Sequence, residues 1–144
     1  MFDNQQKAGY ILCFNTQDIW TQFLEKYADE FNIPFSSLEE TRVQFDRVRD
    51  AASEAGRDPK SLLYSNALVL CCGKSEEEIA RRASKIGREV SELRENGAAG
   101  SPAELVDKIG RFGELGASRV YLQTLDLADL DHLELVASEV MPQL

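Results

Sequence analysis

The stretch that decides the fold is GSPAELVDKIGRFGELGASRVYLQT, which runs from Gly100 to Thr124. Ser101 is a good helix N-cap, Pro102 suits the first helical position, and Glu104 closes a capping box three residues after the serine. The apolar residues that follow recur at helical spacing and predict one buried stripe. Gly116 then ends the helix, and SRVYLQT after it is typical of a strand. The stretch therefore predicts a capped helix, a glycine stop and a strand.

The chain before this stretch repeats the order of strand and helix. YILCF at residues 10–14 predicts a strand ahead of an amphipathic helix in DIWTQFLEKYA at 18–28. EFNIPF at 30–35 predicts a second strand, and the capping box SLEE at 37–40 opens a helix that Gly56 ends. Two further strand–helix units are therefore expected before residue 57.

The third and fourth units follow the same order. LLYSNALVLCCG at 62–73 is almost continuously apolar, which is typical of a parallel strand covered on both faces. The capping box SEEE at 75–78 starts a helix that continues or restarts as REVSELREN at 88–96, and NGAAG breaks it. After the strand SRVYLQT, a closing helix is expected in DLDHLELVASEV at 129–140.

Four alternating strand–helix units build a parallel sheet through right-handed crossovers. They form either a small open α/β sheet or half of a TIM-type (β/α)8 barrel, which needs about 250 residues in full. We predict the half-barrel, with four parallel strand–helix units. Such a half has two open edge strands and one uncovered face of the sheet, so dimerisation is expected.

The composition of the chain limits the functions that it is expected to have. With 144 residues and 43% hydrophobic content, the chain is expected to form one domain, residues 1–144. Acidic residues outnumber basic ones 25 to 16, which gives a net charge of −9 and argues against nucleic acid and anionic membranes as partners. No stretch is apolar for long enough to span a membrane, and no secretory leader is recognisable. Three cysteines without paired spacing fit a reducing, cytoplasmic location.

Four motifs together resemble one family. They are YADEFNIPF at 27–35, AGRDP at 55–59, GSPAELVDKIGRFGELGASRVYLQ at 100–123 and LELVASEVMPQL at 133–144. In this combination the chain is similar to the C-terminal half of the luciferase-like monooxygenases and coenzyme F-420-dependent oxidoreductases. These are eight-stranded barrels that use FMN or coenzyme F-420. The resemblance covers residues 27–144, and residues 1–26 form a divergent first strand–helix unit.

The resemblance implies that the four predicted strands correspond to the fifth to eighth strands of the family's barrel. It implies flavin- or deazaflavin-dependent oxidoreduction, with the cofactor ring carrying the hydride and the protein positioning it. The chain departs from the family just before the helix at 18–28. Family members have a glycine-rich turn there that approaches the cofactor phosphate, whereas this chain has CFNTQD. Independent catalysis is therefore left open, and no catalytic residue is predicted.

The candidate cofactor-binding residues are those at the carboxyl ends of the predicted strands, where barrel enzymes place their chemistry. They are Asn15, Thr16, Asn32, Gln123 and Thr124. Asn32 and Gln123 have amides that suit a flavin-like ring or a substrate. The alternative is that polar residues at strand ends satisfy loop backbone groups.

The remaining candidates favour structural roles. His132 is the single histidine, and the neighbouring Asp129, Asp131 and Glu134 indicate a solvated helix start. Adjacent cysteines in a strand point to opposite faces, so the pair at 71–72 cannot bind one metal, and we predict buried thiols and no metal site. The glycines of NGAAGSP favour a helix cap over an anion cradle, and the acidic clusters complement helix dipoles.

Three functions follow from these observations. The first is an oxidoreductase-derived half-barrel that closes a barrel as a homodimer, or with another barrel chain, and binds FMN or coenzyme F-420. The second is a non-catalytic half-barrel that acts as an oligomeric or partner-binding subunit. The third is a small doubly wound binding domain, which the lack of a glycine fingerprint disfavours.

Overall fold

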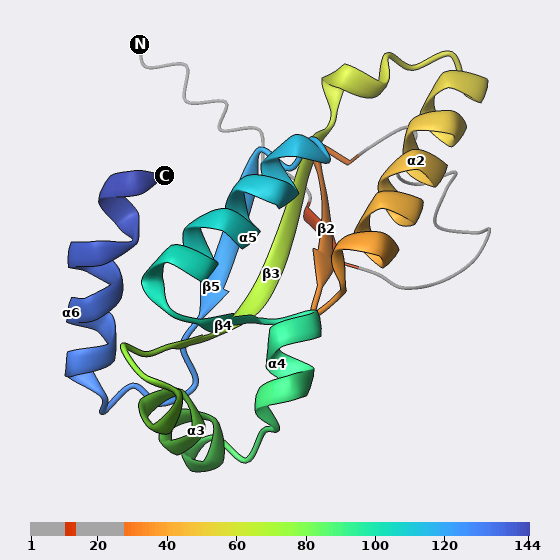
Figure 1. Ribbon diagram of the computed structural model, residues 1–144. Helices are drawn as coiled ribbons and strands as arrows, with labels where there is room; N and C mark the ends of the chain where they lie inside the picture. The colour runs from red at the N-terminus through yellow and green to blue at the C-terminus, as the bar shows by residue number, and fades with distance from the viewer. Residues whose placement is uncertain (1–10, 14–27) are drawn as a thin grey trace, which may run out of the picture.

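The computed structural model of the chain describes residues 11–13 and 28–144 (Figure 1). The candidates Asn15 and Thr16 lie outside the described residues, and so does the helix predicted at 18–28, except for its last residue. The strands are β1 (Ile11–Cys13), β2 (Glu30–Pro34), β3 (Leu63–Cys72), β4 (Ala98–Gly100) and β5 (Arg119–Gln123). The helices are α2 (Leu38–Glu54), α3 (Glu76–Lys85), α4 (Val90–Asn96), α5 (Pro102–Glu114) and α6 (Leu130–Glu139), with short 3-10 turns at Pro59–Ser61 and Met141–Gln143.

The sheet is organised around β3. β2 pairs with its first half, from Leu63 to Ala67, and β5 pairs with its middle, from Ser65 to Val69. β4 pairs with its last three residues, and β1 pairs with β2. Every pairing is parallel, as the alternation of strands and helices predicts. The described sheet is therefore a parallel half-barrel with β1 at one edge and β5 at the other.

The pairing of β3 with β4 was not expected. NGAAG predicts only the end of a helix, because Ala and Gly have low strand propensity. In the structure the backbone of this stretch is buried beside the end of β3, where Gly73 N–H donates to the Gly100 carbonyl (3.0 Å). The short strand forms because buried backbone groups must be paired, not because its side chains favour a strand.

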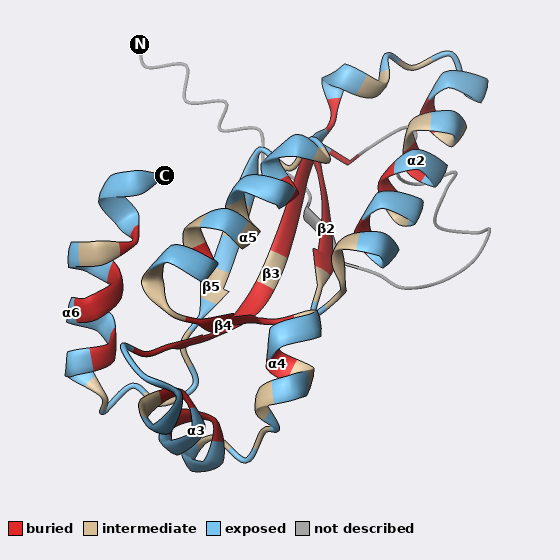
Figure 2. Ribbon diagram, in the orientation of Figure 1, coloured by how far each residue is buried: buried red, intermediate tan, exposed pale blue. Residues whose placement is uncertain are grey.

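Helices cover the two faces of the sheet unequally (Figure 2). Phe31, Ile33 and Tyr64 pack with α2, while Leu68, Leu70 and Cys72 pack with α5 and α6. On the opposite face, Val69 and Cys71 at the end of β3 pack with α3 and α4. Ser65, on the same face in the first half of the strand, is also fully buried. Eight of the ten residues of β3 are buried, so the prediction that this strand is covered on both faces is confirmed for all of it except Leu63 and Ala67.

Capping explains where the helices start. Ser37 and Glu40 form a reciprocal capping box on α2, and Ser101 and Glu104 form one on α5. On α3 the Ser75 side chain accepts from the Glu78 N–H, but the Glu78 carboxylate accepts from the Lys74 N–H, one residue earlier than a capping box requires. Within residues 28–144 no helix is both long and apolar enough to cross a membrane.

Gly100 and Gly110 give a paired test of this geometry. Gly100 has φ of +145°, and a Cβ there would lie 2.8 Å from the Glu104 carboxylate that caps α5. We expect Gly100→Ala to lower the free energy of unfolding by about 1–3 kcal/mol. Gly110 lies inside α5 with open space around it, so Gly110→Ala should raise stability by about 0.5–1 kcal/mol. Urea denaturation of both variants measures the difference, and equal effects would contradict the cap geometry.

Candidate functional site: the inner face of the sheet

The candidate site is the face of the sheet that α2, α5 and α6 do not cover, which we call the inner face. Side chains alternate between faces along a strand. In β2, Phe31 and Ile33 pack toward α2, so Glu30 and Asn32 lie on the inner face. In β5, Val120 and Leu122 pack with the α5 and α6 core, which leaves Arg119, Tyr121 and Gln123 on the inner face. This face is therefore polar.

Glu30 is the central charged group of the inner face. Its side chain is only 3% exposed, and a buried carboxylate requires partners. Arg119 Nη1 donates to Glu30 Oε2 (2.8 Å), and the Tyr121 hydroxyl donates to Oε1 (2.9 Å). The hydrogen bond with Tyr121 and the charge of Glu30 raise the pKa of Arg119. Tyr121 and Arg119 themselves remain exposed, so their outer atoms are accessible to a ligand or partner.

A second polar pair lies one step along the strands. Asn32 Nδ2 donates to Ser65 Oγ (2.8 Å), and both residues are buried. Asn32 is aligned with Ser65, and Ser65 is aligned with Arg119, so these residues share one level across β2, β3 and β5. The inner face therefore carries a continuous polar band near the amino ends of the strands.

The structure places the sequence-predicted residues at different levels of this face. Asn32 is buried within the polar band, whereas Gln123 is exposed and is aligned with Val69, four residues further along β3 than Ser65. At about 3.3 Å per residue, the two amides are separated by about 13 Å along the strand direction. Thr124 is half-buried directly after β5. Asn32 and Gln123 thus share a face but not a single pocket.

The carboxyl end of β3 is occupied by a polar cluster that sequence reasoning missed. His132 Nε2 accepts from the Cys72 N–H (2.8 Å), and Arg82 Nη1 donates to the Cys72 carbonyl (2.8 Å). Arg82 Nε donates to Asp129 Oδ2 (2.9 Å), and Asp129 Oδ1 accepts from the His132 N–H (2.9 Å). The cluster fixes the start of α6 to the end of the central strand, and Arg82 and His132 are buried.

The expectation of a solvated His132 is therefore wrong. Its ring is buried and accepts a main-chain hydrogen bond, and burial, followed by the charge of Arg82, lowers its pKa. The physical reason is that the neighbouring carboxylates point outward or engage Arg82, while the ring lies inward. Arg82 had a sequence signal that was not used, because it shares the helical face of Ile79 and Ala83.

The cysteines at the end of β3 are buried, as predicted. Cys71 packs with α3 and α4, and Cys72 packs with α5 and α6, so the two thiols lie on opposite faces. Burial raises the pKa of both thiols, that of Cys72 to about 11. A protonated thiol is a poor nucleophile and metal ligand. Among residues 28–144, no group of three or more His, Cys, Asp or Glu side chains is placed to hold a metal ion.

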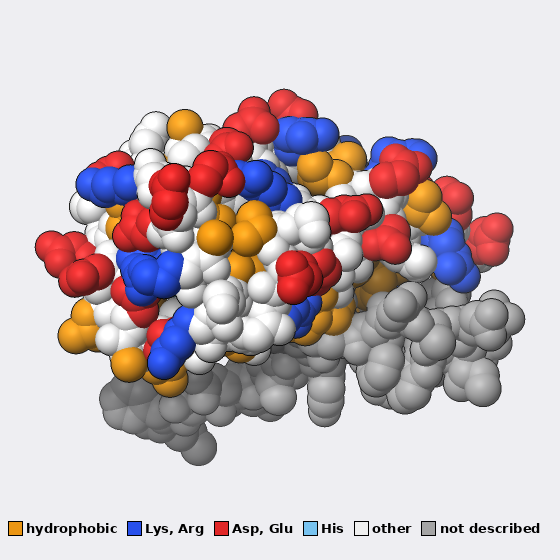
Figure 3. Space-filling view, turned by 60° about the horizontal axis from the view of Figure 1, so that its bottom comes forward, with side chains coloured by type: hydrophobic (Ala, Val, Ile, Leu, Met, Phe, Trp, Pro, Cys, Tyr) orange, Lys and Arg blue, Asp and Glu red, His pale blue; other side chains and the backbone are white. Residues whose placement is uncertain are grey.

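The starts of α2, α3 and α5 are poorly suited to a phosphate group. In each, one amide of the first turn is bonded to the serine N-cap, and its own residue is a glutamate: Glu40, Glu78 and Glu104. A phosphate there would face a carboxylate instead of free N–H donors. Figure 3, which turns the carboxyl ends of the strands forward, shows acidic and basic side chains interspersed.

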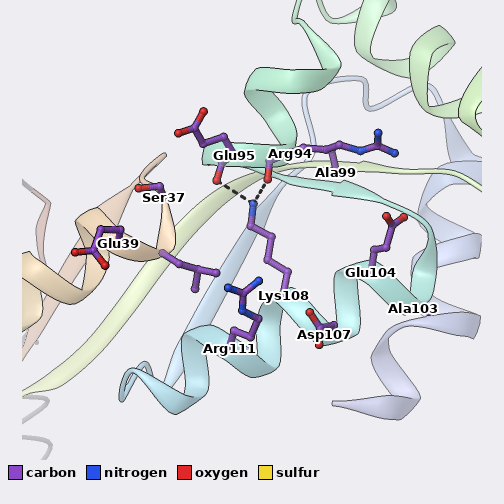
Figure 4. Close-up of a pocket in the computed structure, with 11 residues that line it drawn as sticks. Ser37, Glu39, Arg94, Glu95, Ala99, Ala103, Glu104, Asp107, Lys108 and Arg111 are labelled. Carbon is purple, nitrogen blue, oxygen red and sulfur yellow. Dashed lines mark hydrogen bonds between the residues drawn. The ribbon is translucent and has the colours of Figure 1, made fainter.

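A separate groove of about 640 Å3 lies between the start of α2, the end of α4 and the flank of α5 (Figure 4). Lys108 reaches from α5 across this groove, and its Nζ donates to the carbonyls of Arg94 (2.5 Å) and Glu95 (3.0 Å). Burial and the neighbouring Arg111 lower the pKa of Lys108. Lys108 therefore acts as a C-terminal cap for α4.

The comparisons with known proteins concern the fold. No protein-family model and no curated protein matches the sequence. Among solved structures, the coenzyme F-420-dependent tetrahydromethanopterin reductase from Methanopyrus kandleri superposes with a TM-score of 0.71 at 15% identity. The match covers 93% of this chain and 50% of that chain.

Two monooxygenases have the same half of the fold. The EDTA monooxygenase from a Chelativorans species matches with a TM-score of 0.65 at 15% identity, over 89% of this chain and 44% of its own. The oxygenating constituent of 3,6-diketocamphane monooxygenase from Pseudomonas putida, solved with FMN, matches with a TM-score of 0.61 at 16% identity, over 93% and 48%. The chain therefore shares its fold with part of each of these proteins and spans about half of their length.

The single histidine makes the β3 cluster testable by pH. In the unfolded chain the pKa of His132 is about 6.5, whereas in the folded chain this pKa is lower. Below pH 6.5 the unfolded state therefore binds more protons, and stability falls by up to about 1.4 kcal/mol per pH unit until the folded pKa is reached. When the pH is lowered from 7.5 to 5.5, the free energy of unfolding, measured with urea, should fall by about 1 kcal/mol more in wild type than in His132→Gln. An equal fall in the two proteins would contradict a buried neutral ring.

Lys108 gives a second test in the same region. We expect Lys108→Met, which keeps the aliphatic stem but removes both hydrogen bonds, to lower the free energy of unfolding by about 1 kcal/mol. Lys85→Met, at an exposed position in the last turn of α3, is the matched control and should change stability by less than about 0.5 kcal/mol. Equal losses would show that Lys108 does not cap α4.

Proposed function

We propose that the chain forms the C-terminal half of a luciferase-like oxidoreductase barrel and binds FMN or coenzyme F-420 against its inner face, once a second half completes the barrel. The observation that carries this proposal is the polar inner face, with Glu30, Arg119 and Tyr121 bonded to one another and Gln123 exposed beside them. A sheet face meant for plain hydrophobic packing would not carry a buried carboxylate and its partners.

Each residue has a distinct part in this proposal. Arg119 and Tyr121 hold the Glu30 carboxylate, and Ser65 holds the Asn32 amide, so the polar band is fixed before a ligand arrives. Gln123, which is exposed, and Thr124, which is half-buried, lie closer to the carboxyl ends of the strands and supply hydrogen-bonding groups for the edge of a ring. When bound, the flavin or deazaflavin ring supplies the hydride chemistry. The protein positions it and excludes water.

A non-catalytic half-barrel is the second candidate, and one observation favours it. The starts of α2, α3 and α5 are each capped by a serine and carry a glutamate in the first turn, which disfavours a cofactor phosphate at these three helices. In this alternative the chain completes an oligomer or another barrel chain and holds no cofactor.

Titration with each cofactor decides between the two candidates. The full chain is titrated with FMN and with coenzyme F-420, and binding is followed by cofactor fluorescence. We expect saturable binding of one of them, and we expect Gln123→Ala to raise its Kd about fivefold through loss of a hydrogen bond of about 1 kcal/mol. Gln44→Ala on α2 is the matched control and should leave the Kd unchanged. Absence of saturable binding for both cofactors would favour the non-catalytic half-barrel.

A further inference from the structure

The last strand–helix unit has an unusually apolar surface. Of the ten large hydrophobic side chains that are exposed in the described residues, seven lie between Tyr121 and Leu144. Leu127 and Leu130, on the connection from β5 to α6 and at the start of α6, are 75% and 69% exposed. Isolated exposed leucines are ordinary, but a concentration in one unit marks an interaction surface.

The exposed apolar residues of α6 and of the turn after it form a stripe of their own. Leu130, Leu133 and Ala137 lie on α6 at spacings of three and four, Met141 and Leu144 follow beyond its end, and all five are exposed. A different set, at positions 132, 135, 136 and 140, packs against the sheet and α5. One buried stripe is sufficient for a helix that covers a sheet. The second stripe therefore indicates that another element packs on α6.

The sheet is open beside this surface. β5 pairs only with β3 in the described part of the chain, and its other edge has no strand against it. Figure 1 shows α6 at the outer margin of the molecule, beyond α5. An open edge strand next to an apolar helix face is the surface on which a barrel receives its next strand–helix unit. We call this surface, made of β5, Leu127 on the connection to α6 and the exposed stripe that begins at Leu130, the seam.

We propose that the seam binds a second copy of this chain, whose β1 edge adds to β5. Strands β1, β2, β3 and β5 of the two copies then close one eight-stranded barrel, and β4 stays paired with the end of β3 outside this count. The proposal rests on the half-barrel part of the proposed function, but not on its cofactor. β1 and β5 are the opposite edges of the described sheet and both run parallel to their neighbours, so a two-fold axis along the barrel places β1 of each copy beside β5 of the other. Two copies also supply the length of the reductase barrel that one chain half covers.

Charge decides which surfaces of the two copies meet. After Arg119 the chain has no lysine or arginine, while Asp126, Asp131 and Glu134 lie among the exposed leucines. Two seams placed face to face would oppose like charges. The seam therefore faces the β1 edge of the second copy instead of another seam, and this arrangement also closes the barrel without leaving an edge.

Analytical ultracentrifugation of the full chain tests the proposal. We expect wild type to sediment at twice the 16.1 kDa mass of one chain at concentrations of about 10–100 micromolar. Leu130→Lys should weaken the dimer at least tenfold, because it places a charge in the apolar stripe. Val43→Lys, at an exposed apolar position on α2, is the matched control and should remain dimeric.

A second variant separates loss of the dimer from loss of folding. Leu127→Lys lies before α6 at the most exposed of these leucines and should also weaken the dimer, with an unchanged circular dichroism spectrum. A monomeric wild type, or a dimer that persists in both leucine variants, would contradict the proposal that the seam binds a second copy. Cofactor titration of the same samples tests the oxidoreductase proposal separately. A dimer that binds neither FMN nor coenzyme F-420 would contradict that proposal and leave the seam standing.

Discussion

The ten residues of β3 take part in three parallel strand pairings at once, and the positions of all other described elements follow from them. β2 and β5 pair with overlapping parts of β3, so they must lie on its opposite edges. The crossovers that join parallel strands place α2 and α5 on the same face of the sheet. On the opposite face, α3 and α4 pack on the end of β3, and the first half of the strand carries Ser65 in the polar band.

This half-covered sheet explains why the inner face is polar. A carboxylate in a closed apolar core is costly unless its partners are close, and Arg119 and Tyr121 supply them for Glu30. The hydrogen bonds of Glu30 in this band also hold β2 and β5, which are far apart in the sequence, in a fixed position relative to each other. The end of β3 is fixed differently, by His132 and Arg82 on the backbone of Cys72. The chain thus separates a strand end held by buried side chains from a polar face on which Arg119, Tyr121 and Gln123 are exposed.

Sequence reasoning predicted the fold well because its signals are local. Serine and glutamate three residues apart start α2 and α5, and the apolar run of β3 marks a central parallel strand. The polar contacts were not predictable in this way. Glu30 and Arg119 are 89 residues apart, and their pairing depends on the alignment of β5 with β3. His132 was misjudged because its neighbours in sequence are acidic, whereas its neighbours in space are Arg82 and the backbone of Cys72.

The most direct test of the account is hydrogen exchange at the β5 edge in the full chain. The central claim is that β5 lies inside a closed barrel and not at the edge of an open sheet. In a closed barrel every amide from Arg119 to Gln123 is bonded to one neighbouring strand or the other, so all five should exchange slowly. If the amides that do not point toward β3 exchange as fast as those of an exposed loop, the sheet is open and the claim is contradicted.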